Sequence, residues 1–212
     1  ISSTTDVLMV KSGDWEVIGD LILPIEVPLL IGPGTSLRFD ENAILLARAP
    51  LLIRGELESP VHLGPKGASW GGIVVLGVDG KSELSHVLVS GTRGINRNGW
   101  QLTGGITYYE SPVSLFRCRI FGSQAEDALN IVRSEFNIAE CAFEDHRSDA
   151  FDGDFVSGQI RDSSFRDIGG DAIDLSGSFV RVENVSVTRI GDKGISAGEA
   201  SEVEVFDYQS VS

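Results

Sequence analysis

Large apolar residues return along this chain at a nearly constant interval. One column of them is spaced by 33 residues at its first step and then by 23, 22, 22 and 22, and a Gly or Ala precedes every member. Its members are Ile73, Ile106, Leu129, Phe151, Ile173 and Ile195. A fixed period of this length is typical of repeat architectures, in which each repeat can bury its apolar face only against its neighbours.

A second column runs beside the first with the same period. Its members are Leu84, Leu115, Ile138, Ile160, Val182 and Val205. They open segments of the form apolar-x-x-apolar-x-apolar, as at 138–143, 160–165 and 182–187, and the alternation predicts short strands. The polar break inside each segment, at Glu140, Asp162, Asn184 and Asp207, predicts a sharp corner, because Asn and Asp tolerate the left-handed backbone that such a bend needs.

These patterns predict an all-β fold, a parallel β-helix of about 22 residues per coil and roughly eight or nine coils. Each unit is too short for a crossover helix, and no window keeps a helical apolar spacing. Strands are also expected at 36–41, 51–58, 60–65 and 70–77, between Gly and Pro corners. We expect residues 1–14 to form a cap or edge segment and 15–212 the β-helix, with a loop insertion at 91–105.

Composition narrows the choice of partners. The net charge of −14 argues against nucleic acid and anionic membranes, which need clustered Lys and Arg, and no apolar run is long enough to span a bilayer. The chain has no initiator Met and no signal peptide, so we expect it to be part of a larger polypeptide. An open apolar end after the last coil predicts further chain there, or self-association.

Acidic residues recur at the same period and are the first candidates for chemistry. One file holds Asp127, Asp149, Asp171 and then Lys193, and the second holds Asn130, Asp152, Asp174 and Ser196. Carboxylates on adjacent coils, about 5 Å apart, repel by about 1 kcal/mol in water and about 3 kcal/mol at an effective dielectric of 20. Three explanations stay open: corner caps with Lys193 as a counter-ion, a bound Ca²⁺, or catalysis.

The insertion at 91–105 is the second candidate site. It carries Arg93 and Trp100, and Tyr108 and Tyr109 follow directly. Aromatic and Arg side chains suit stacking on sugar rings and pairing with acidic glycans, whereas the alternative is a surface loop whose Trp100 covers a core edge. Cys118 and Cys141 fall at one repeat position, and we expect stacked reduced thiols in the core, although their predicted spacing also permits a disulfide.

Several phrases carry a resemblance to a known family. IGPGTSLRFD, LIRGELES, PVHLGP and WGGIVVLG, followed by GGDAIDLSGSFVRVENVSV and GDKGISAGEASEVEV, are similar to right-handed parallel β-helix repeat proteins of the pectate-lyase-like superfamily. The resemblance covers residues 20–212 and implies a right-handed, single-stranded β-helix. It also implies an extracellular or cell-envelope location, in a bacterium, and a carbohydrate partner. The fold alone does not select among lyases, hydrolases, epimerases, adhesins and repeat domains.

Within that superfamily the corner phrases resemble those of polygalacturonase-type hydrolases. SDAFD, GGDAIDLSG and GDKGISAG stand about one coil apart, where the hydrolases have phrases like NTDGFD, DDCIAI and GHGLSIG. The match implies that Asp149 and Asp171 flank a glycosidic bond. The chain departs from the pattern at Gly170, where the hydrolases have Asp, and at Lys193, where they have His, and it has no Arg-x-Lys phrase.

Three functions follow from these residues. The first is a carbohydrate-associated, non-catalytic binding or scaffold module that uses Asp127, Asp152, Asp174, Lys193 and the 91–105 loop. The second is a glycoside hydrolase or lyase with Asp149 and Asp171 as catalytic acids, and the third is a structural spacer on a surface protein. We expect no cofactor apart from a possible Ca²⁺, because no phosphate loop or zinc motif occurs.

Overall fold

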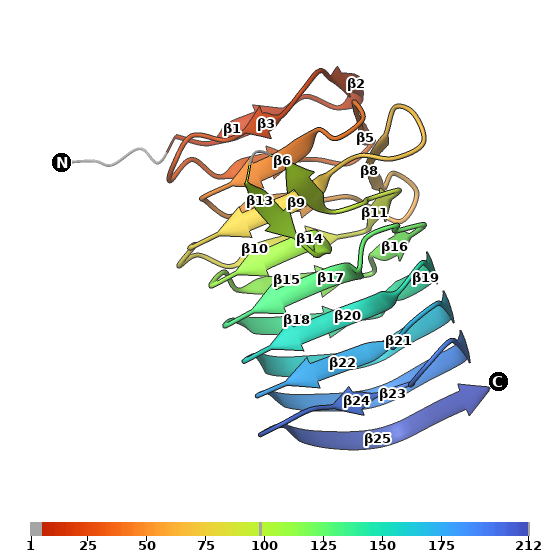
Figure 1. The fold of residues 1–212 in the computed structure, drawn as a ribbon. Coiled ribbons are helices and arrows are strands. Elements are labelled where there is room, and N and C mark those ends of the chain that lie inside the picture. The colour runs from red at the N-terminus through yellow and green to blue at the C-terminus, as the bar shows by residue number, and fades with distance from the viewer. Residues whose placement is uncertain (1–5, 98, 212) are drawn as a thin grey trace.

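The computed structural model describes residues 6–97 and 99–211, and this part of the chain winds into a parallel β-helix of about nine coils. Figure 1 shows the coils stacked in chain order from the N-terminal to the C-terminal end. The predicted fold class is therefore confirmed. Across the described residues the structure contains no helix of the length and apolar character needed to cross a membrane.

Strands of the larger sheet, which has 15 strands, form two walls of the coil. The first wall contains β1 (Leu8–Val10), β4 (Leu29–Ile31), β7 (Leu51–Arg54), β10 (Ser82–Ser85), β15 (Val113–Phe116) and β18 (Glu135–Ala139). The second contains β2 (Gly13–Val17), β5 (Thr35–Phe39), β8 (Val61–Pro65), β11 (Val87–Ser90), β16 (Arg119–Phe121) and β19 (Ala142–His146). In the last three coils the two walls merge into the long bent strands β21 (Ser157–Ile168), β23 (Phe179–Ile190) and β25 (Glu202–Val211).

A second sheet of eight strands closes the coil on its remaining side. Its strands are β3 (Leu21–Ile22), β6 (Ile44–Ala47), β9 (Gly72–Leu76), β14 (Gly104–Tyr109), β17 (Asp127–Val132), β20 (Asp149–Asp154), β22 (Ile173–Ser176) and β24 (Ser196–Ala197). All pairings within both sheets are parallel. Candidate chemistry lies mainly on and around this eight-stranded sheet.

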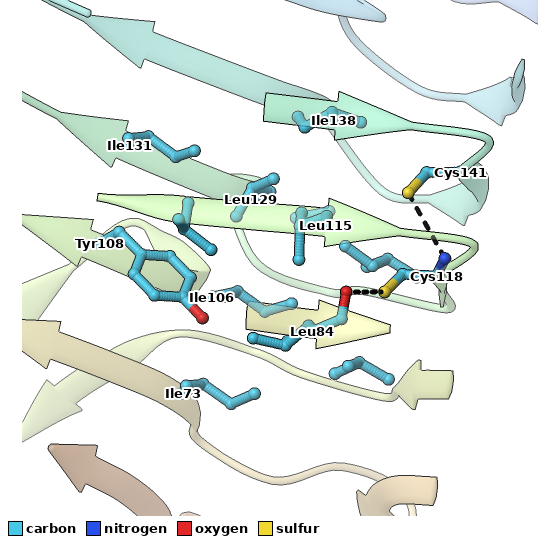
Figure 2. Packing of buried hydrophobic residues seen from close by; sticks show 14 of the residues in the cluster. Ile73, Leu84, Ile106, Tyr108, Leu115, Cys118, Leu129, Ile131, Ile138 and Cys141 are labelled. Atoms are coloured by element: carbon cyan, nitrogen blue, oxygen red, sulfur yellow. Dashed lines mark hydrogen bonds between the residues drawn. The ribbon is translucent and has the colours of Figure 1, made fainter. Parts of the chain in front are cut away.

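The strand register places the predicted columns in vertical files. Ile73, Ile106, Leu129, Phe151 and Ile173 are successive partners in the eight-stranded sheet. Leu84, Leu115, Ile138, Ile160, Val182 and Val205 are successive partners in the larger sheet. Both files point into the core except at Val205 on the last coil, as Figure 2 shows for the middle coils. Each fully buried side chain of this kind contributes about 1.5–3 kcal/mol, so the stack of equal coils accounts for the stability of the fold.

Left-handed residues mark three corners of the coil. The middle corner, inside the larger sheet, has φ of 52°, 51°, 50° and 48° at Glu140, Asp162, Asn184 and Asp207, which confirms the predicted bend. A second corner, before the eight-stranded sheet, has positive φ at Gly122, Asp145, Asp167 and Arg189. The third corner lies where the chain leaves the eight-stranded sheet, and we call it the first-exit corner. Its left-handed residues are Gly77, Glu110, Arg133, Phe155, Gly177 and Ala200.

Three segments depart from regular coils. Strand β1 lies within 1–14 and already pairs Leu8 with Leu29, so in-register stacking begins before residue 15, while residues 1–5 lie outside the described part. The 91–105 insertion contains an antiparallel hairpin, β12 (Ile95–Arg97) and β13 (Trp100–Leu102), which lies over the outer face of the eight-stranded sheet (Figure 1). Strand β25 pairs only with β23 and leaves Val205 and Phe206 exposed.

The two cysteines lie side by side in the core, as free thiols on adjacent coils. The backbone N–H of Cys118 donates to Cys141 Sγ at 3.4 Å, and Cys118 Sγ lies 3.4 Å from the carbonyl oxygen of Leu84 (Figure 2). On the next coil Ser163 Oγ takes the same role and accepts from the N–H of Cys141 at 3.1 Å. A thiol or hydroxyl directly after the middle corner therefore satisfies the backbone N–H of the coil before it.

We predict that Gly169 cannot carry a side chain. A Cβ there would collide with the carbonyl oxygen of Arg147 on the preceding coil, a rigid backbone atom. Gly169→Ala should lower the free energy of unfolding by about 1–3 kcal/mol, measured by urea denaturation. Gly67→Ala is the matched control, since its Cβ meets nothing within 4 Å and should leave stability unchanged. Equal stability of the two variants would contradict the coil spacing at this corner.

Candidate functional site

The first acidic file forms hydrogen bonds between coils. The N–H of Asp171 donates to Asp149 Oδ1 at 2.7 Å, and the N–H of Lys193 donates to Asp171 Oδ1 at 2.7 Å. Lys193 Nζ lies 3.3 Å from Asp171 Oδ2, so it acts as the counter-ion at the end of the file. Each carboxylate thus takes the place of a backbone carbonyl, and the energy of a charge-assisted bond offsets the repulsion along the file.

This arrangement explains why the chain has Gly170 where the polygalacturonase-type phrases have Asp. A Cβ at Gly170 would overlap Asp149 Oδ1, which leaves no space for the Asp that polygalacturonase-type phrases have at this position. The carboxylate of Asp149 occupies that space because it bonds to the N–H of Asp171. Burial raises the pKa of Asp149, and the bond from the N–H of Asp171 partly opposes this.

Asp127 connects the acidic file to the hairpin segment. It is in register with Asp149, only 4% of its surface is exposed, and its backbone N–H donates to the carbonyl oxygen of Thr103, directly after β13, at 3.4 Å. Burial raises the pKa of Asp127 to about 6, with smaller contributions from the charges of Asp149 and Glu126. The insertion and the acidic file, 22 or more residues apart in sequence, are therefore neighbours in one site.

The second file lies on the outer face of the eight-stranded sheet. Asn130, Asp152, Asp174 and Ser196 are successive partners, and Asn130 Nδ2 donates to Asp152 Oδ2 at 2.6 Å. Burial raises the pKa of Asp152 to about 8, and the charges of Asp127, Asp154 and Asp174 add to this effect. Asp152 therefore holds its proton at neutral pH, unlike an exposed carboxyl.

These acids do not form a close metal-ligand cluster. In the part of the chain that the structure describes, no three His, Cys, Asp or Glu side chains are arranged to hold a metal ion. Because successive carboxyls stand one coil apart and bond to amides, their oxygens are spread along the axis rather than around one point. Calcium binding stays a prediction.

A cavity of about 540 Å³ lies between the hairpin and the corner that precedes β17 and β20. Hydrogen-bonding side chains dominate its lining, and they come from three places: Asn42; the insertion, with Arg93, Asn96, Arg97, Gln101 and Thr103; and Gln124, Glu126 and Arg147. Arg93 pairs with Glu41 and Arg97 with Asp20. Arg147 makes no ion pair with the described residues, so its guanidinium is available to a ligand. We call this cavity the hairpin pocket.

Trp100 lies on the other side of the hairpin. It borders a smaller cavity of about 160 Å³ together with Ile22, Leu46 and Arg97, and 42% of its surface is exposed. Beneath the hairpin, Ile95 packs with Ile44 and Val74 in a small apolar cluster outside the main core. The hairpin thus covers an apolar part of the sheet and still presents the indole to solvent. Ile95 and Arg97 line both cavities, so the two cavities are neighbours at the hairpin.

The structure corrects the prediction that Tyr108 contacts substrate. Tyr108 is fully buried, with 0% exposure, because it shares the inward direction of Ile106 two residues before it on β14. Strand alternation from Ile106 could have shown this. Tyr109 points outward but lies at the first-exit corner, where its hydroxyl accepts from Arg133 Nη1 at 3.1 Å. Neither Tyr is among the residues that line the hairpin pocket.

Four residues in or near the hairpin pocket are not among the predicted site residues. The hairpin pocket is also lined by Gln124, Glu126 and Arg147, which lie outside the repeat columns and the insertion and precede the starts of β17 and β20 by one to three residues. His146 is buried beside Phe143, and its Nδ1 accepts from the N–H of Ser123 at 3.3 Å. Burial lowers the pKa of His146 to about 4, so it is neutral at pH 7.

No protein-family model matches the sequence, and no curated protein matches it. Among solved structures, the chain is similar to the A-module of mannuronan C-5 epimerase AlgE4 from Azotobacter vinelandii, at 10% identity and a TM-score of 0.31, over 97% of this chain and 86% of that one. It is also similar to the catalytic unit of the GH87 α-1,3-glucanase from Streptomyces thermodiastaticus strain HF3-3, at 13% identity and a TM-score of 0.26, over 97% of this chain and 63% of that one. At these values neither likeness says what this chain binds.

We predict that Asp152→Asn stabilises the protein at neutral and alkaline pH. The carboxyl has a pKa of about 8 when folded and about 3.8 when unfolded, so between these values the folded state binds more protons and its stability falls as the pH rises. The variant lacks this loss and keeps an oxygen acceptor for Asn130 Nδ2. Thermal unfolding should show no gain at pH 4 and a gain of about 2 kcal/mol at pH 8, less than the full linkage value because the carboxyl is partly solvated.

Asp14→Asn, a substitution at an exposed position on β2, is the control and should show no such trend. A gain that is constant between pH 4 and pH 8 would contradict the assignment, because an uncharged effect of the substitution does not depend on proton binding.

Proposed function

We propose that this chain is a carbohydrate-binding β-helix module that holds a polysaccharide in the hairpin pocket. The observation that carries the proposal is the pocket itself, about 540 Å³ in volume and lined by amides, guanidinium groups and a carboxylate. This volume lies within the range of small-ligand sites, and side chains of this kind match the many hydroxyl groups of a sugar. Such a module meets its ligand outside the cytoplasm, on a cell envelope or in the surrounding medium.

Trp100 extends the binding surface beyond the pocket. The indole is 42% exposed, and Arg97 lines both the hairpin pocket and the smaller cavity that the indole borders. A glycan chain that enters the pocket and crosses the hairpin would place one ring on the indole face and another near Arg147. Trp and Arg are the residue types that most often supply the binding energy of an interface.

The bonds of the first acidic file favour binding over turnover at Asp149 and Asp171. A general acid or base must change its protonation state during the reaction, whereas these carboxylates accept backbone N–H bonds that hold adjacent coils together. Asp171 is 6% exposed and is also paired with Lys193. Protonation of either group would weaken the corner that supports it.

One observation favours a hydrolase as a second candidate. Asp152, with its pKa raised to about 8, holds a proton at neutral pH as a general acid requires, and Asp174 stands one rung away on the same outer face. Glycosidases use a pair of carboxyl groups that flank the glycosidic bond. In this candidate Asp152 would protonate the leaving oxygen and Asp174 would be the second carboxyl of the pair.

We predict that Trp100→Ala and Arg147→Ala each weaken polysaccharide binding at least tenfold, measured by affinity electrophoresis and calorimetry against a panel of plant and bacterial polysaccharides. Both side chains are exposed, so the thermal midpoint should change little. Arg117→Ala, at an exposed Arg on the middle corner that pairs with Glu140, is the control and should keep full affinity.

Release of reducing ends or unsaturated products from the same panel separates the two candidates. The binding module predicts none, whereas turnover that is lost in Asp152→Asn with binding retained would support the hydrolase. An absence of both binding and turnover across the panel would overturn the proposal and leave a spacer.

A further inference from the structure

A long groove follows the first-exit corner, on a different side of the coil from the hairpin pocket. It consists of two cavities of about 780 Å³ and 540 Å³, and both are bordered by Val78, Asp79 and Glu110. The lining residues come from the turns after β3, β6, β9, β14, β17, β20 and β22, which are seven successive coils. At about 4.8 Å per coil the groove runs about 30 Å along the axis. We call it the corner groove.

Two exposed aromatic rings stand in the corner groove. Phe155 is 61% exposed and Phe179 is 60% exposed, and both line the second cavity. Phe155 also has a φ of 54°, a left-handed conformation that is unfavourable for a bulky residue. The other coils have Gly77, Gly177 and Ala200 at this corner, or the long polar side chains of Glu110 and Arg133, and Phe155 is the one aromatic residue among these six. Phe155 is thus unfavourable in two ways, in its backbone and in its exposed apolar surface, and such positions point to a function.

The neighbours of Phe155 hold its ring in place. A Cβ at Gly177 would lie 2.7 Å from Phe155 Cδ1, so the glycine on the next coil makes room for the ring. The guanidinium of Arg133 lies 5.7 Å from the ring centroid on the other side and donates to the hydroxyl of Tyr109. Tyr109, Arg133 and Phe155 therefore form a vertical, preorganised platform over three coils.

Backbone N–H groups at this corner are paired from coil to coil. The N–H groups of Gly77, Glu110 and Arg133 donate to Tyr109, Val132 and Asp154 on the following coil, at 3.0, 2.9 and 2.8 Å. The N–H of Phe155 donates in the same way to Ser176 at 2.8 Å. An extended peptide could not add here as a strand, because that mode needs unpaired backbone groups. Recognition has to come from rings and side chains that recur once per coil, which suits a polymer of rings.

Charge excludes one class of polymer. Glu26, Asp79, Glu110 and Glu135 line the groove against Arg48 and Arg133, and the chain as a whole carries −14. The acidic residues outnumber the basic ones in this lining, so a polyanionic glycan would be repelled. We propose that the corner groove binds a linear polysaccharide without acidic groups, aligned with the β-helix axis, with its sugar rings stacked on Phe155 and Phe179. This surface is separate from the hairpin pocket, and the inference does not depend on that site.

The test uses the 212-residue protein and calorimetric titration with neutral linear hexasaccharides of glucose, mannose and xylose, with hexagalacturonate as the acidic counterpart. We expect binding of at least one neutral probe and none of hexagalacturonate at this groove. Phe155→Gly should weaken that binding at least tenfold while the thermal midpoint stays equal or rises, because glycine removes the left-handed strain. Phe179→Ala should weaken the same binding.

Asp145→Gly is the matched control, since it makes the same backbone change at an exposed left-handed corner position outside the groove and should keep full affinity. Unchanged affinity in Phe155→Gly and Phe179→Ala would overturn the proposal, as would hexagalacturonate or peptide binding that these substitutions abolish. Trp100→Ala distinguishes the two sites, because it should affect only ligands of the hairpin pocket.

Discussion

Coil-to-coil register is the constraint on which the rest of this structure depends. Each coil pairs its backbone with the coils before and after it, so every position repeats as a vertical file about 4.8 Å per rung. A single residue more or less within a strand would turn its inward side chains outward, which explains why the apolar columns keep their spacing so strictly. The corners absorb the bending through left-handed residues at fixed places, and long insertions occur only between strands.

The register also brings the acidic residues of successive coils close together in vertical files. A file of equal carboxylates repels itself, and each file here relieves that repulsion in a different way. Asp149 and Asp171 accept backbone N–H groups and end at Lys193, so they remain part of the scaffold. Asp152 instead sits between the amide of Asn130 and the charge of Asp174, and burial keeps it protonated. Asp therefore serves as an ionised hydrogen-bond acceptor in one file and as a protonated carboxyl in the neighbouring file.

Much of the fold could be predicted from the sequence, because the residue types show both the repeat period and the alternation of apolar and polar positions along each strand. The columns through Leu129 and Ile138 and the corners at Glu140 and Asp162 follow directly from spacing. The site was less accessible. The prediction for Tyr108 was wrong because residues two apart on a strand point to the same face, so Tyr108 follows Ile106 into the core although it lies next to the insertion in sequence. Arg147 carries no periodic signal, and it becomes a pocket residue only because the hairpin folds back over the corner that precedes β20.

Departures from the repeat are where this protein offers surface to a ligand. A regular coil has its backbone paired with the adjacent coils and its apolar face buried against them, so recognition requires an added or substituted element. The hairpin is an added element: it creates walls around a pocket on a sheet that would otherwise be open. Phe155 is a substituted element, an exposed ring at a corner where glycine or alanine would fold more easily. Both elements sit on a stack of about nine coils whose register is fixed by pairing with the neighbouring strands, so a β-helix can carry exposed or left-handed binding residues at its edges without a change of register.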